Sequence, residues 1–176
     1  MISPTLPTTR DYVQNHLNPM TVTQRVTAAS IKLGGIKPPQ ESVLNGYVSV
    51  LDFSSVTENE IFLTGIVSES FQSGSSLKVS ILWVPKDTLT GLVGWEIESS
   101  FTPVGASFGV SVSSTLHQDT LANLTLHKTA KAFLVGGLAG DAIAVRLYRN
   151  IDIDTYPNDA RFFGVEFEMT VDRLGK

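Results

Sequence analysis

The chain has 176 residues, of which 42% are hydrophobic and 17% charged, and its formal net charge is −4. This composition is typical of one globular domain and excludes a disordered chain or a coiled coil. The lack of cysteine excludes disulfides and thiolate metal sites, and with no apolar run of about 18 residues and no secretory signal pattern we expect a soluble protein made in a cytoplasm.

Residues 1–42 differ from the rest and are predicted to form an extended N-terminal arm. They hold five of the eight prolines, together with six threonines. Proline interrupts helices and central strands, and the pair Pro38-Pro39 marks a boundary. A short strand over 21–26 is compatible with this composition. We expect the arm to become ordered on a partner.

The arm is also mildly basic, while the body is acidic. Residues 1–42 hold four basic and two acidic residues, a net +2, and the remainder holds nine basic and fifteen acidic residues, a net −6. Opposite charges favour docking on an acidic neighbour. The partner-binding residues expected in the arm are Arg10, Arg25, Lys32 and Lys37.

Residues 43–176 are predicted to form a β-sandwich domain, because apolar and polar residues alternate with a period of two. The expected strands are, in chain order, 47–53, 61–67, 77–83, 93–98, 107–113, 124–135, 142–147 and 163–171. In the last of these, Phe163, Val165, Phe167, Met169 and Val171 share one apolar face. The fold class is therefore all-β, a two-sheet antiparallel β-sandwich that is jelly-roll-like and carries an extended N-terminal arm; another Greek-key sandwich is the alternative.

The histidines and serines do not form a recognisable catalytic or metal site. His16, His117 and His127 lack zinc spacing and are interpreted as surface residues. The letters Gly105-Ala106-Ser107-Phe108-Gly109 match the serine-nucleophile pattern, but they lead into an alternating strand rather than a strand-to-helix elbow. We therefore expect no hydrolase triad and no enzyme activity.

Two pairs of glutamates, each two residues apart on a strand, have a separation of about 7 Å that would suit a glycosidase. They are Glu96 with Glu98 and Glu166 with Glu168. We interpret both pairs as solvated strand faces. Trp83 and Trp95 fall on the inward faces of two neighbouring predicted strands, where core packing is the expected role.

An acidic loop near the C-terminus offers hard oxygen atoms, but it lacks the spacing of a calcium loop. Its acidic residues are Asp152, Asp154 and Asp159. We expect them to pair with nearby arginines, namely Arg146, Arg149 and Arg161. Because these arginines are expected to pair with carboxylates, we do not interpret them as a nucleic-acid binding patch. We also expect no metal, cofactor or membrane partner.

Two stretches carry a family resemblance. They are residues 73–83 followed by Gly94-Trp95-Glu96-Ile97, and residues 138–149 followed by 159–168. Together they resemble a β-sandwich, jelly-roll-like module of tailed-bacteriophage virion structural proteins, of the capsid decoration or cement type. The resemblance covers about residues 60–168 and leaves the arm outside. Within it, Gly140-Asp141 forms a turn, and Arg146 or Arg149 reaches the acidic loop to tie the last hairpin together.

The resemblance implies a non-enzymatic virion protein, assembled in the host cytoplasm, that stabilises the phage head shell through its arm and an oligomeric sandwich, expected to be a homotrimer. The implied partners are the major capsid protein or other virion proteins. The alternative is a tail, baseplate or fibre component that contacts a host receptor or glycan. Loop residues expected to make such a contact are Asp152, Asp154, Tyr156 and Asp159.

Overall fold

The computed structural model describes residues 19–31, 33, 37–72, 74–107, 112–119 and 124–172. The elements in this part of the chain are β1 (Met20–Thr27), the 3₁₀ turn η1 (Ala28–Ser30), β2 (Gln40–Leu44), β3 (Val48–Phe53), β4 (Glu60–Ile66), β5 (Leu77–Pro85), β6 (Leu92–Thr102), β7 (Val112–Asp119), β8 (His127–Lys128), β9 (Ala132–Leu134), β10 (Ala142–Arg149) and β11 (Ala160–Val171). None of the described residues forms a helix long and apolar enough to span a membrane.

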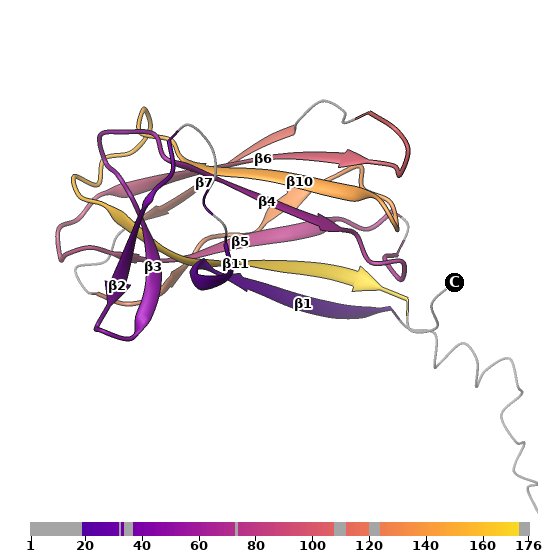
Figure 1. The fold of residues 1–176 in the computed structure, drawn as a ribbon, viewed down its shortest axis with the longest axis horizontal. Coiled ribbons are helices and arrows are strands. Elements are labelled where there is room, and N and C mark those ends of the chain that lie inside the picture. Colours follow the sequence, from indigo (N-terminus) through magenta and orange to yellow (C-terminus); the bar gives the residue numbers. More distant parts are fainter. Residues whose placement is uncertain are drawn as a thin grey trace, which may run out of the picture.

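The strands form two antiparallel sheets that face each other. The large sheet has the order β2-β3-β11-β5-β8, with β1 also paired to β11 and β9 also paired to β5, and the small sheet has the order β4-β10-β6-β7. Figure 1 shows β6, β10 and β4 as one layer over β5, β11 and β1. The facing orders β3-β11-β5-β8 and β4-β10-β6-β7 are those of a jelly roll. The predicted fold class is confirmed.

The structure corrects the boundary of the predicted arm. β1 pairs with β11 along its whole length, with Met20 opposite Val171 and Thr27 opposite Gly164. Valine and threonine suit a strand, and Pro19 stands just outside the ladder, where a missing N–H costs nothing. The strand expected over 21–26 is thus confirmed, and the sandwich includes residue 20 onward instead of starting at residue 43. Residues 1–18 lie outside the described part of the chain.

Two strand predictions differ from the structure for local reasons. The register between β11 and β5 shifts between Phe162 and Gly164, so Phe162 is fully buried while Phe163 is only partly buried. The single strand expected over 124–135 is divided into β8 and β9. Between them Thr129 accepts a hydrogen bond from the Ile81 N–H through its hydroxyl (2.9 Å), which interrupts the regular ladder.

A third difference concerns the strand expected over 107–113. The described strand is β7, which continues through a Ser- and Thr-rich run to Asp119, where alternation gives no signal. His117, expected in a loop, lies in this strand. Residues 108–111 are outside the described part.

The core is centred on two tryptophans that meet across the sandwich. Trp83 of β5 and Trp95 of β6 are both 0% exposed, and their ring centroids are 6.3 Å apart. Phe53 contacts Trp95 edge-on at 5.1 Å. The predicted core role of both tryptophans is confirmed, but they belong to facing sheets rather than to neighbouring strands.

Candidate functional site

The acidic loop is fixed by one buried arginine. The side chain of Arg149 at the end of β10 is 0% exposed, and its Nε and Nη2 atoms donate to the Asp154 carboxylate at 2.6 and 2.9 Å. Its remaining donors reach three main-chain oxygens, those of Phe53 (2.9 Å), Asn158 (2.8 Å) and Tyr156 (2.8 Å). All five guanidinium N–H groups are therefore used. The prediction that Arg149 ties the last hairpin to this loop is confirmed.

This arrangement removes two expected contact residues from the surface. Asp154 is held by Arg149, and Tyr156 is 2% exposed, with its hydroxyl donating to the Asp87 carboxylate at 3.0 Å. The pKa of Tyr156 is raised above its usual value, mainly because the side chain is buried. Asp159 forms an ion pair with Lys86 at 2.5 Å. Only Asp152 among the four expected loop residues is exposed to solvent without a side-chain ion pair in the described structure.

The basic residues of the predicted arm are not gathered into one patch. Arg25 of β1 contacts Glu166 at 2.9 Å and keeps 70% of its side chain exposed. Lys37 is exposed in a bend before β2. Arg10 and Lys32 lie outside the described residues.

The paired glutamates are occupied by cations rather than set up for acid–base chemistry. Glu166 is bound by Lys128 and Arg25, which in that order lower its pKa. Glu168 is bound by Lys78 (3.1 Å) and Lys131 (2.6 Å). Glu166 is only 6% exposed, so the prediction that it lies on a solvated strand face is wrong.

The small sheet carries a second charged cluster on its outer face. Arg146 contacts Glu58 (3.1 Å), Glu60 (2.6 Å) and Glu98 (3.3 Å). The expected pairing of Arg146 with the acidic loop is wrong, because its position in β10 directs its side chain over the partner strands β4 and β6. Glu96 instead accepts a hydrogen bond from the Asn150 amide at 2.7 Å.

His127 is a core residue, contrary to the surface interpretation. It pairs with Trp83 in the β5–β8 ladder, so both side chains point to the same face. The two rings stack with centroids 4.9 Å apart, and His127 is 6% exposed. Among the described residues, no group of three His, Asp or Glu side chains is placed to hold a metal ion.

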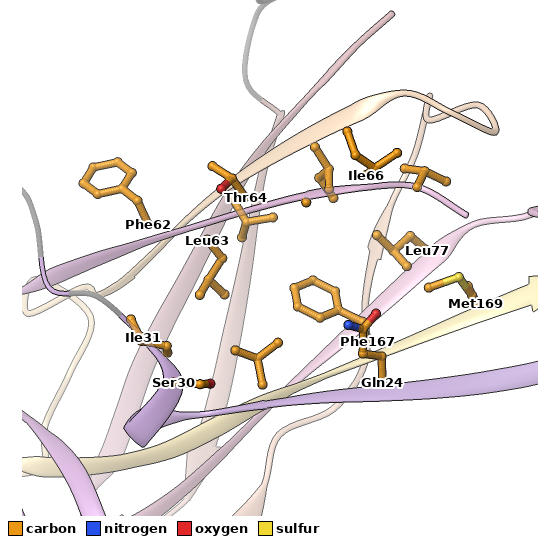
Figure 2. A pocket seen from close by; sticks show the side chains of 15 residues that line it. Gln24, Ser30, Ile31, Phe62, Leu63, Thr64, Ile66, Leu77, Phe167 and Met169 are labelled. Atoms are coloured by element: carbon orange, nitrogen blue, oxygen red, sulfur yellow. The ribbon is translucent and has the colours of Figure 1, made fainter. Parts of the chain in front are cut away.

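A different feature, which alternation alone did not reveal, is an apolar cleft at one side of the sandwich. It has a volume of about 390 Å³ and opens between β1 and β11 of the large sheet and β4 and β10 of the small sheet. Its apolar walls include Leu63, Ile143, Val145, Leu77, Phe167 and Met169. Figure 2 shows Leu63 and Phe167 directed toward the space between the strands, with Ile31 at one end and Met169 at the other. No charged side chain lines the described cleft.

The cleft exists because the sandwich is open on this side. Phe167 and Met169 belong to the inward face of β11, yet both remain partly exposed. Within the described chain, β1 pairs only with β11 and β4 pairs only with β10, so both strands that border the cleft have a free edge. The β4 segment 61–66 contains no charge and no proline. Charged residues and proline normally prevent an exposed strand edge from pairing with another chain, and this edge has neither.

Comparisons with known proteins give a weak structural likeness. No family model and no curated protein sequence matches the chain. Among solved structures, the chain is similar to the CBM36-1 domain of a multidomain xylanase from the hindgut metagenome of Trinervitermes trinervoides, with a TM-score of 0.49, 12% identity, and coverage of 83% of this chain and 96% of that chain.

Proposed function

We propose that the protein is a structural component of a phage particle, of the capsid decoration or cement type, which works by binding neighbouring protein subunits. The observation that carries this proposal is the apolar cleft between two free strand edges. A free edge offers main-chain donors and acceptors to an extended polypeptide, and an adjacent apolar cleft accepts alternate side chains of the same segment. The cleft therefore suits a protein partner.

The chemistry of the cleft favours this reading over the receptor- or glycan-binding alternative. A sugar is recognised through several polar groups beside an aromatic platform, whereas the cleft presents few polar side chains, among them Gln24, Ser30 and Thr64. The loop residue on which a platform depended, Tyr156, is buried. The phage assignment itself rests on the resemblance of residues 60–168.

A second set of exposed apolar side chains also supports a role in an assembly. It lies along the segment that contains β8 and β9, and each of its large apolar side chains is more than half exposed. These side chains are Leu124, Leu126, Phe133, Val135 and Leu138. Large apolar side chains exposed to water favour burial against a partner. The major capsid protein is the partner that these side chains would meet.

Particle binding by a cleft variant tests the proposal. Ile66 lines the cleft and is 65% exposed, so Ile66→Arg places a charge at the docking surface with little cost to the fold. We expect this variant to be lost from purified particles, and the particles to release DNA at a lower temperature. Val56→Arg is the matched control, because Val56 is 81% exposed in the loop before β4 and outside the cleft. Absence of the unmodified protein from particles, or full particle binding by Ile66→Arg, would contradict the proposal.

A further inference from the structure

We propose that the cleft of one copy is filled by residues 1–18 of a neighbouring copy, which add as a strand to the free edge of β4. This inference rests on the proposed function and names the partner segment. In the proposed oligomer, each copy inserts its residues 1–18 into the cleft of a neighbouring copy.

The first argument is that the sandwich lacks one strand at this side. Leu63 on β4 and Phe167 on β11 face the same cleft from opposite sheets. An added strand beside β4 would complete the hydrogen bonds of 61–66 and place every second side chain over Phe167 and Met169. The covered side chains are the inward-facing ones that the described chain leaves partly exposed.

The second argument is the length and position of the chain that precedes β1. Eighteen residues precede Pro19, and an extended segment of that length spans about 60 Å. β4 needs about 23 Å of partner strand. β1 begins at Met20, opposite Val171, and Val22 lies opposite the cleft residue Met169. The segment therefore starts beside the cleft and is long enough to reach another copy.

The third argument is the composition of the segment. Its charged residues are one arginine and one aspartate, Arg10 and Asp11, so it is neutral like the cleft. Its prolines are Pro4 and Pro7, which leaves 8–18 free of proline and longer than β4. In the proposed added strand, Val13, Asn15 and Leu17 would share one face.

The fourth argument distinguishes a neighbouring copy from the same copy. Return of the segment along its own β1 in a tight hairpin needs a two-residue turn with positive φ angles. Pro19 stands at that position, and proline fixes φ near −65°. A two-residue reversal directly before β1 is therefore disfavoured, which suits a segment that leaves its own sandwich.

Disulfide cross-linking of the full-length chain tests the inference. The chain has no native cysteine, so any disulfide must involve the introduced residues. Two single variants, Val13→Cys and Leu63→Cys, are mixed and oxidised, because Leu63 lies on the inward face of β4; a second pair uses Leu17→Cys with Leu63→Cys. We expect a covalent dimer on a denaturing gel from at least one pair, and at least a fivefold weaker band when Val56→Cys replaces Leu63→Cys. Deletion of residues 1–18 should also convert the oligomer into a single chain with an unchanged circular dichroism spectrum.

Three outcomes would overturn the inference. They are the absence of a cross-link with either pair, a doubly substituted chain that closes only within itself, and an oligomer that survives deletion of residues 1–18. Failure of the inference differs from failure of the proposed function. If particle binding still depends on Ile66 while no cross-link forms, a segment of another virion protein fills the cleft and the proposed function stands.

Discussion

The end of the sandwich around Arg149 and the cleft beside β1 are built from the same two strands, but they are completed differently. β10 runs from Ile143 in the cleft to Arg149 at the closed end, and β11 runs from Phe162 at the closed end to Met169 in the cleft. At the closed end Phe162 and Arg149 are fully buried, and every donor of the arginine has a partner. At the cleft, apolar side chains and strand edges remain open. One end provides stability, and the other is available for binding.

The largest effect is expected from breaking the closed end. Arg149→Met removes the cation beside the buried Asp154 carboxylate, which keeps the main-chain N–H groups of Gly94 and Tyr156, and it removes a donor from three carbonyl oxygens. We expect the free energy of unfolding to fall by about 3–5 kcal/mol. Urea denaturation measures this change. Arg25→Met is the comparison, because an arginine whose side chain is 70% exposed contributes about 1 kcal/mol or less. Equal effects of the two substitutions would show that the closed end is not the stabilising one.

Two phenylalanines on β11 test the same contrast with identical chemistry. Phe162 is 0% exposed, and Phe162→Ala should lower the free energy of unfolding by about 3–5 kcal/mol. Phe167 is partly exposed in the cleft, so Phe167→Ala should cost only about 1 kcal/mol. Denaturant midpoints of the two variants check the difference. Costs within experimental error of each other would mean that the cleft is packed as tightly as the core.

Most of the closed end could be predicted from the sequence. Alternation located most strands, because every second residue of a half-buried strand is apolar. The number and spacing of the strands indicated a sandwich, and only their pairing decides between a jelly roll and another Greek key. The bulge at Phe162 was hidden, since Phe162 and Phe163 are equally apolar and only pairing with β5 decides which one faces inward. The pairing of Arg149 with the loop could be expected because the two groups are close in the sequence.

The open half depends on contacts between distant segments and could not be predicted. The threonines and flanking prolines of residues 19–27 indicated an arm, and only the pairing of β1 with β11 shows that these residues wall a cleft. Phe167 and Met169 were correctly placed on an apolar face. Their partial exposure follows from the position of β4 at the edge of the small sheet, which no local pattern records.

Acid should weaken the contact that holds β1 to the body. Lys128 and Arg25 keep the pKa of Glu166 below its usual value of 4.5. Above that pH the carboxylate is ionised in both states and the stabilisation is complete; as the pH falls through the lowered pKa, the folded protein loses it. Glu166→Gln should therefore flatten the dependence of unfolding free energy on pH below about 4.5. An unchanged slope in the variant would mean that this ion cluster does not stabilise β1.

The smallest effect is expected from His127, which reports on how dry the closed core is. Desolvation lowers its pKa from the usual 6.5, and its Nε2 atom has no hydrogen-bond partner among the described residues. Below pH 6.5 the unfolded chain binds a proton that the folded chain resists, so the free energy of unfolding should decrease as the pH falls from about 7.5 to about 5.5. His127→Phe keeps a ring on Trp83 and removes the titration, so its stability should be flat in this range, above the window of Glu166. A wild-type protein that is equally flat would show that water reaches His127 as it reaches the cleft, and the contrast between the two regions would disappear.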